Sequence, residues 1–363
     1  MEAQSRAAGK RFPVHRVSGL FRGGRREVDL RKGDEIPGLG VSGGAPPRLS
    51  LGAFPTAVER VAGAPGLWVK RDDAASPVYG GNKVRKLEYL LARAEARGKR
   101  RVVTMGAAGS HHVLATAVFA RARGLAVTAV ITSQPRTEHA AKNLRASVGL
   151  GVEVVPAWEG SLPLQVLAAW GPDAEIVPLG GSSPLGALGY VDAARELAAQ
   201  IRAGECEEPE VCVVAAGSGG TAAGLAVGFA LERLRTRVIG VSVARPVFVV
   251  DWGTRFLASR TAALVGADPA AVAERIAIDG AWVGRGYGHA TEAGASAHAA
   301  ARAHGLALDV TYTEKAFAAA LAEVGRGRST LYWHSLSSAP FDPLLRGAPA
   351  ERALPAEVRS RLA

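Results

Sequence analysis

Short apolar runs alternate with longer amphipathic stretches along most of this chain. Seven runs rich in valine and isoleucine predict buried strands, at 67–71, 101–106, 126–131, 152–157, 175–180, 211–217 and 237–244. Runs that are apolar at nearly every position are typical of parallel strands covered on both faces. Helices are predicted between them at 84–97, 113–123 and 222–234, and a glycine follows each of the first two.

This alternation of strands and helices predicts a parallel α/β architecture. Parallel sheets bind their ligands at the carboxyl ends of the strands, so chemistry is expected in the turns that follow strands. With 363 residues and 48% hydrophobic content, the chain is long enough to form two domains.

Composition narrows the range of partners. The chain carries a net charge of +11, but its arginines are scattered among acidic residues, and aromatic residues make up only 6%. No zinc-finger, RNP or helix-turn-helix pattern is visible, so a solvated basic surface is favoured over nucleic-acid binding. No run of about 18 apolar residues occurs, so no membrane-spanning helix is expected.

Cysteine usage and the first residues favour a cytoplasmic protein. Cys206 and Cys212 are too few for a disulfide framework and lack the spacing of a metal site. Residues 1–45 are rich in glycine, arginine and proline, which predicts a poorly ordered extension. The first residues lack the apolar stretch of a secretory signal, and their arginines leave a transit peptide as an alternative.

The most specific local signal is the turn after the sixth predicted strand. Gly217, Ser218, Gly219, Gly220 and Thr221 stand there in a row, before a helix of small residues. Glycines let the backbone approach a ligand closely, and free N–H groups at a helix start bind anions. The turn therefore favours a phosphate site, although it matches neither the P-loop nor the full dinucleotide fingerprint. An ordinary tight turn is the alternative.

A second turn places a lysine at the start of the first predicted helix. Gly80, Gly81 and Asn82 precede Lys83, and two further cations follow within three residues. Positive charge is unfavourable at a helix N-terminus, so this cluster indicates a bound anion or a neutral lysine. A lysine made less basic by neighbouring cations and by desolvation is a nucleophile for carbonyl groups. On spacing alone, a solvated basic turn is an equal alternative.

Longer stretches around these turns carry a family resemblance. They read VKRDD, GGNKVRKLEYLL, GSHH, GGSSPLGALGYVDAARELAAQ, GSGGTAAGL, GRGYGHATEAG and LDVTYTEKAFAAAL, in this order. Over most of its length the chain resembles the D-cysteine desulfhydrase and 1-aminocyclopropane-1-carboxylate deaminase family. The resemblance implies pyridoxal 5'-phosphate as the cofactor and a tryptophan synthase β-like fold. That fold has two open, twisted, mostly parallel α/β domains with the cofactor in the cleft between them.

The resemblance also implies how the chain is divided. The smaller domain is an insertion in this family, which places it at 83–194. The larger, cofactor-binding domain then combines 46–82 with 195–350, and 351–363 form a C-terminal tail. A homodimer is implied in the same way.

Roles for individual residues follow from the resemblance. Lys83 would hold the cofactor covalently and then act as a base, and Ser110 would lie at the substrate carboxylate. Tyr287 and Tyr312 would flank the substrate, where a tyrosine can trade a proton; without the resemblance, both are read as packed structural residues. The implied catalytic residues are Lys83, Ser110, Tyr287 and Tyr312, and the implied cofactor-binding residues are Asn82, Lys83, His111, Gly217, Ser218, Gly219, Gly220, Thr221, Thr313 and Ser335.

Several positions depart from the family pattern. His111 stands where the family has an asparagine that bonds the cofactor's ring hydroxyl oxygen, and a histidine is bulkier and titrates near neutrality. Residues 334–338 lack two glycines of the loop that closes over the cofactor or substrate. His111 and the adjacent His112 have no third ligand nearby, so no metal site is expected.

These features favour a pyridoxal-phosphate lyase that acts on a small amino acid. Thr313 stands where the deaminase branch has a glutamate, as it does in the desulfhydrase branch. The preferred reaction is therefore β-elimination from D-cysteine to pyruvate, ammonia and sulfide. One alternative is a 1-aminocyclopropane-1-carboxylate deaminase, which would release 2-oxobutanoate. A cofactor-binding protein with little catalysis is the other, motivated by His111 and by the altered residues 334–338.

Overall fold

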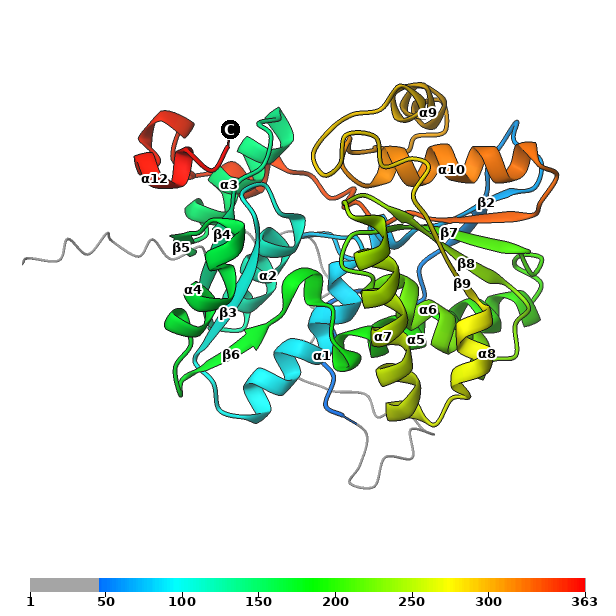
Figure 1. Cartoon of the computed structure of the whole chain (residues 1–363), viewed down its shortest axis with the longest axis horizontal. Helices are drawn as coiled ribbons and strands as arrows, with labels where there is room; N and C mark the ends of the chain where they lie inside the picture. Colours follow the sequence, from blue (N-terminus) through cyan, green and yellow to red (C-terminus); the bar gives the residue numbers. More distant parts are fainter. Residues whose placement is uncertain (1–45, 363) are drawn as a thin grey trace, which may run out of the picture.

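Two sheets organise the described residues, 46–362, of the computed structural model (Figure 1). The larger sheet is formed, in order across the sheet, by β1 (Val58–Arg60), β2 (Leu67–Lys70), β10 (Thr330–Trp333), β7 (Val211–Ala216), β8 (Arg237–Ser242) and β9 (Ile276–Asp279). The smaller sheet is formed by β5 (Glu153–Pro156), β4 (Ala126–Thr132), β3 (Arg101–Ala107) and β6 (Ala174–Val177). Only β1 and β2 pair antiparallel in these sheets, so the mostly parallel α/β architecture is confirmed.

Helices connect the strands. They are α1 (Lys83–Ala96), α2 (His111–Ala122), α3 (Glu138–Gly149), α4 (Leu162–Ala169), α5 (Pro184–Arg202), α6 (Gly220–Leu231), α7 (Val247–Val265), α8 (Pro269–Glu274), α9 (Glu292–Arg302), α10 (Thr313–Gly325), α11 (Asp342–Leu345) and α12 (Ala356–Arg359). Within residues 46–362, four short 3-10 helices complete the set: η1 (Asp72–Ala74), η2 (Glu159–Ser161), η3 (Leu179–Gly181) and η4 (Glu351–Ala353). No helix among residues 46–362 is long and apolar enough to cross a bilayer.

The predicted strands and helices are found, with two ends wrong by three residues: the helix expected at 222–234 ends at Leu231, and a strand also ends early. The strand expected at 175–180 ends at Val177, because Pro178 has no N–H to donate and Gly180 adopts a left-handed conformation with φ 63°. The sequence pattern also misses β1, β9 and β10, which are only three or four residues long.

Small residues let α5 pack closely against both helices that begin at the two predicted site turns. A Cβ atom added to Gly189 of α5 would lie 2.5 Å from the Arg85 carbonyl carbon of α1. A Cβ added to Gly224 of α6 would lie 2.5 Å from the Tyr190 Cβ of α5. Neither position accepts a larger residue without movement of a helix. The first turns of α1 and α6 are thereby held at a defined separation.

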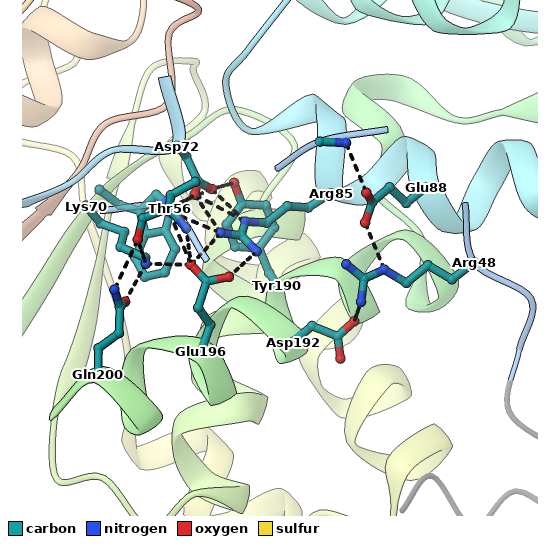
Figure 2. Close-up of polar contacts among 12 residues, drawn as sticks. Arg48, Thr56, Lys70, Asp72, Arg85, Glu88, Tyr190, Asp192, Glu196 and Gln200 are labelled. Atoms are coloured by element: carbon teal, nitrogen blue, oxygen red, sulfur yellow. Dashed lines mark hydrogen bonds and ion pairs between the residues drawn. The ribbon is translucent and has the colours of Figure 1, made fainter. Parts of the chain in front are cut away.

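A buried polar network fixes the start of α1 against the larger sheet (Figure 2). Arg85 donates to the Asp72 carboxylate at 2.8 Å and to Glu196 of α5 at 3.0 Å. Lys70, at the end of β2, donates to the same Glu196 at 2.5 Å. Burial opposes the charge on Asp72, but Arg85 and Lys70 hold the pKa of its carboxyl below the usual value. Because Arg85 lies two residues beyond Lys83, this network also positions that lysine.

The C-terminal residues return to the smaller sheet. Leu354, Val358 and Leu362 are buried in the apolar cluster that includes residues of α2 and β4. The Gln134 N–H donates to the Arg361 carbonyl at 3.0 Å, and α12 packs beside β5 (Figure 1). The tail expected at 351–363 is therefore packed up to Leu362. The extension expected at 1–45 lies outside the described residues, and the domain boundaries at 82/83 and 194/195 stay a prediction.

Candidate active site

One cavity of about 510 Å³ lies where the two sheets face each other. Residues at the carboxyl ends of β3, β4, β7 and β8 line it, as expected for parallel sheets. The cavity brings together all of the site residues predicted from the sequence. They are Asn82, Lys83, Ser110, His111, Gly217, Ser218, Gly219, Gly220, Thr221, Tyr287, Tyr312, Thr313 and Ser335.

Lys83 stands at the first position of α1 and reaches into this cavity. Its Nζ donates to Asn82 Oδ1 at 2.5 Å, and Asn82 Nδ2 donates to Thr221 Oγ1 at 3.1 Å. Removal from water lowers the pKa of Lys83 to about 8, although Asp309 opposes the shift. More of this amine is therefore neutral near physiological pH than for an ordinary lysine, and the neutral form is the nucleophile for carbonyl groups.

The glycine turn forms the wall next to Lys83. Gly219 precedes α6 with φ 77°, a conformation that favours glycine, and the first N–H groups of the helix face this turn. Ser182 joins the turn from the side: its Oγ lies 2.7 Å from Ser218 Oγ and accepts from the Gly220 N–H at 3.2 Å. Free N–H groups and hydroxyls in this arrangement suit a phosphate.

Lys86, one of the two cations that follow Lys83, is a site residue to which the sequence reasoning gave no specific role. It is buried, and its Nζ donates to the Gly180 carbonyl at 3.2 Å and to Ser182 Oγ at 3.3 Å. Within residues 46–362, no carboxylate forms an ion pair with it. Burial, and then the charge of Lys83, lower the pKa of Lys86 well below its usual value. Lys86 follows Lys83 by three residues, and this spacing places both side chains on the same face of α1.

Two tyrosines close another side of the cavity. Tyr312 donates its hydroxyl to that of Tyr287 at 2.8 Å, and the rings meet edge to face with centroids 5.6 Å apart. Burial raises the pKa of Tyr287 to about 12 and that of Tyr312 further, so both hydroxyls keep their protons. Lys315 holds the loop that carries Tyr287, because its Nζ donates to the carbonyls of Val283 and Gly286, both at 2.9 Å.

Asp309 is a residue that the sequence reasoning missed. This buried carboxylate accepts from the N–H groups of Tyr312 and Thr313, each at 3.0 Å, and from Thr313 Oγ1 at 2.6 Å. Burial opposes its charge, but His111 and these hydrogen bonds lower the pKa of Asp309. The hydroxyl proton of Thr313 is committed to Asp309, so Thr313 can only accept from a ligand. The sequence offered no spacing signal for this acid.

Ser110 and the two histidines lie at the start of α2. Ser110 Oγ caps the helix by accepting from the N–H groups of His112 and Val113, at 3.2 and 3.4 Å. The histidines diverge, as neighbouring residues on a helix must. His112 Nε2 lies 3.0 Å from Thr104 Oγ1 in the smaller sheet, whereas His111 packs beside Tyr312 with ring centroids 6.2 Å apart.

Comparison with known proteins agrees with this geometry. Residues 49–335 match the family described as pyridoxal-phosphate dependent enzymes. A nocardicin C-9' epimerase from Nocardia uniformis subsp. tsuyamanensis is 35% identical over 322 residues, which span 85% of this chain and 98% of that protein. A D-cysteine desulfhydrase from Klebsiella pneumoniae is 37% identical over 292 residues, spanning 75% and 87%. The crystal structure of an ACC deaminase homologue superposes with a TM-score of 0.69 at 29% identity, over 83% and 96% of the two chains.

The chain therefore belongs to the pyridoxal-phosphate dependent enzymes. The resemblance to D-cysteine desulfhydrases and ACC deaminases that its motifs indicated is confirmed, and so is the tryptophan synthase β-like fold. The residues present fit the cofactor of this family. A half-buried amine with a lowered pKa suits its aldehyde. The buried Lys86 amine beside the glycine turn has a pKa well below its usual value, and a bound phosphate would supply the anion that favours its charged form.

Proposed function

We propose that this protein is a pyridoxal-phosphate lyase that converts D-cysteine and water to pyruvate, ammonia and hydrogen sulfide. The observation that carries the proposal is the half-buried Lys83 amine, which shares one cavity with the glycine turn and with two protonated tyrosines. The D-cysteine desulfhydrase relatives support the choice of substrate. Thr313, in place of a glutamate, supports elimination of the sulfur rather than opening of a cyclopropane ring.

The residues that line the cavity would have different roles in this reaction. Lys83 and the turn from Gly217 to Thr221 would hold the aldehyde and phosphate ends of pyridoxal phosphate, with Lys86 neutralising the phosphate. When bound, this cofactor stabilises the negative charge that develops when the substrate Cα loses its proton. The Lys83 amine would accept that proton, because its lowered pKa leaves part of it unprotonated near neutral pH.

The two tyrosines would donate a proton to the leaving group, whereas Lys83 accepts one from the substrate. The departing sulfur of D-cysteine needs a proton, and Tyr312 and Tyr287 retain theirs because burial raises both pKa values. Ser110 would bind the substrate carboxylate, because its hydroxyl proton can be donated to an anion while its oxygen accepts from the N–H groups of α2. The substrate would therefore lie between α2 and the tyrosine pair.

Absorbance of the purified protein tests this proposal. Pyridoxal phosphate held by a lysine absorbs at roughly 410–430 nm, and we expect this band in the wild-type protein and its loss in Lys83→Ala. Lys99→Ala, which removes a lysine beyond the far end of α1, is the matched control and should keep the band. D-cysteine should then release sulfide and pyruvate in equal amounts. A band with no product would leave the cofactor assignment standing and reject the substrate.

Epimerisation of an amino acid is a second candidate function. One relative is named a nocardicin C-9' epimerase and is 35% identical over nearly its whole length. Epimerisation needs one group to remove the Cα proton and another to return it, and the cavity offers both Lys83 and the tyrosine pair. Conversion of a D-amino acid to its L-form without release of ammonia would favour this candidate, and 2-oxobutanoate from 1-aminocyclopropane-1-carboxylate would favour the deaminase.

We also propose that the protein forms a homodimer in the cytoplasm. One face of α7 exposes four apolar residues: Phe248, Val249, Trp252 and Phe256, each 49–72% accessible to solvent. Single exposed apolar residues are common on protein surfaces, whereas a cluster of them indicates an interaction site. A twofold axis would let this face cover itself on a second copy. Cys206 and Cys212 are free thiols, which supports a reducing compartment. Light scattering of wild type and Trp252→Asp would test the dimer, since the variant should be monomeric.

A further inference from the structure

Two arginines line the active-site cavity without a part in the proposed reaction. Arg245 follows β8, and Arg285 stands in the loop between β9 and α9. Arg245 Nε donates to the Gly284 carbonyl at 3.1 Å, so the two arginines belong to neighbouring segments on the larger-sheet side of the cavity. Both are exposed, and among residues 46–362 neither forms an ion pair with a carboxylate. Their positive charges are therefore available to a ligand.

The backbone around Arg285 is held in place by hydrogen bonds. Lys315, fully buried in α10, donates to the carbonyls of Val283 and Gly286, both at 2.9 Å. The hydrogen bond from Arg245 adds a third restraint to the same loop. The position of this loop is thereby fixed before a ligand arrives, and such preorganisation lowers the entropic cost of binding.

The smaller-sheet side of the cavity adds apolar surface. Leu162 begins α4 and Leu179 begins η3, and both line the cavity, with Leu179 48% exposed. Glu159 of η2 lines the same side and brings one exposed negative charge. The two exposed guanidinium groups outnumber this carboxylate, so the lining favours an anionic group with an aliphatic body.

The arginines lie on the side of the cavity that receives the leaving group. Arg285 precedes Tyr287 by two residues, and Tyr287 belongs to the pair proposed to protonate the departing sulfur. One loop therefore carries both a proton donor for the sulfur and a guanidinium group. A substituent on that sulfur would meet Arg285 and Arg245, whereas the sulfur of D-cysteine carries only hydrogen and leaves both arginines unused.

We propose that Arg245 and Arg285 bind a carboxylate on the leaving group, so that the preferred substrate is an S-substituted D-cysteine whose short aliphatic substituent ends in a carboxylate. This inference rests on the proposed lyase function. S-(2-carboxyethyl)-D-cysteine and water would give pyruvate, ammonia and 3-mercaptopropionate. The Cα proton passes to Lys83, the Cβ–S bond breaks with its electron pair on sulfur, and the tyrosine pair protonates that sulfur. Water then replaces the nitrogen, which leaves as ammonia, so no oxidant or reductant is needed.

Binding is tested with D-2-aminopimelate, in which a methylene replaces the sulfur and no leaving group is present. Its 7-amide has nearly the same size but lacks the distal charge, so it is the matched ligand. Titration of the cofactor-loaded enzyme, followed by the absorbance of the cofactor, gives a Kd for each. The wild-type protein should bind the acid at least about tenfold more tightly than the amide. Equal affinities would overturn the proposal.

Variants assign this preference to the two arginines. Arg245→Gln and Arg285→Gln each replace a guanidinium by a neutral amide, and each should reduce the preference for the acid. The double variant should bind acid and amide about equally well. Arg302→Gln removes an exposed arginine at the end of α9, outside the cavity, and should keep the wild-type preference.

The preference compares two ligands on the same protein, so a general loss of stability or activity does not imitate the expected change. Thermal melting checks that each variant folds. A wild-type preference in the double variant would overturn the proposal.

Turnover separates this inference from the proposed function. In the wild-type enzyme, kcat/KM with S-(2-carboxyethyl)-D-cysteine should exceed that with S-(2-carbamoylethyl)-D-cysteine at least about tenfold, and equal values would overturn the inference. If no thioether and no D-cysteine is cleaved but D-2-aminopimelate binds with the expected preference, the lyase proposal fails and the carboxylate site stands. If D-cysteine is cleaved while acid and amide bind equally, the lyase proposal stands and the carboxylate site fails.

Discussion

Replacement of Lys86 by methionine should weaken cofactor binding without harming the fold. Methionine nearly fills the volume of the lysine side chain and removes a buried amine that has no carboxylate partner. Burial holds the pKa of this amine well below its usual value, so methionine replaces an unfavourably buried polar group and the protein without cofactor should be about as stable as wild type. The loss should appear only when a phosphate occupies the glycine turn.

The magnitude follows from the contact that Lys86 would make. A Cβ atom added to Gly220 would lie 2.9 Å from Lys86 Nζ, so the ammonium lies within reach of any anion in this turn. A hydrogen bond to a charged group contributes about 1.5–3 kcal/mol. Since about 1.4 kcal/mol corresponds to a factor of ten, the affinity for pyridoxal phosphate should fall roughly 10- to 150-fold.

Equilibrium titration of the cofactor-free protein, followed by absorbance, is the assay. Pyridoxal, which lacks the phosphate, is the matched ligand control and should bind Lys86→Met and wild type equally well. Thermal melting of both proteins without cofactor completes the comparison. An equal loss of affinity for pyridoxal and pyridoxal phosphate, or no loss for either, would show that Lys86 does not serve the phosphate.

Three further perturbations probe the backbone, the core and the protonation of the site. Gly219→Ala should destabilise the fold by about 1–3 kcal/mol in urea unfolding, because φ is 77° and the new Cβ would crowd α7, whereas Gly253→Ala, with nothing within 4 Å, should not. Asp72→Asn should cost about 3–5 kcal/mol in the same assay, since it leaves the buried charge of Arg85 with a weaker partner; no change would contradict the network. The rate of cofactor capture by Lys83 should rise with pH and level off above about 8, because the amine must be neutral; a rise that continues to pH 10 would indicate an unshifted lysine.

Much of the site could be predicted from the sequence because its parts are local. The turn from Gly217 to Thr221 and the turn before Lys83 each lie within a few residues, where strand, glycine and helix start follow one another. The family motifs then assigned the cofactor, and the comparisons confirm it. Asp309 escaped notice, and Lys86 received no specific role, because a charged residue with no partner near it in the sequence is usually a solvated surface residue.

One chain of hydrogen bonds could not be predicted at all. Tyr79, His111 and His139 are separated by 28 or more residues in the chain, and each alone is a common packed residue. Hydrogen bonds between distant side chains depend on how helices pack across a sheet, and periodicity carries no information about such contacts. The same applies to the buried network around Asp72, whose partners come from β2, α1 and α5 (Figure 2).

The sequence by itself determined the alternation of strands and helices, the two ligand-binding turns and the family, because each depends on residues that are close together in the chain. Tertiary structure alone decided which charges are buried and which lysine lacks a counter-ion, because burial depends on everything packed around a group. It also decided that Ser110 caps its own helix while His111 turns toward His139. Protonation in this site follows from desolvation and from neighbours distant in sequence, and only the folded chain brings those neighbours together.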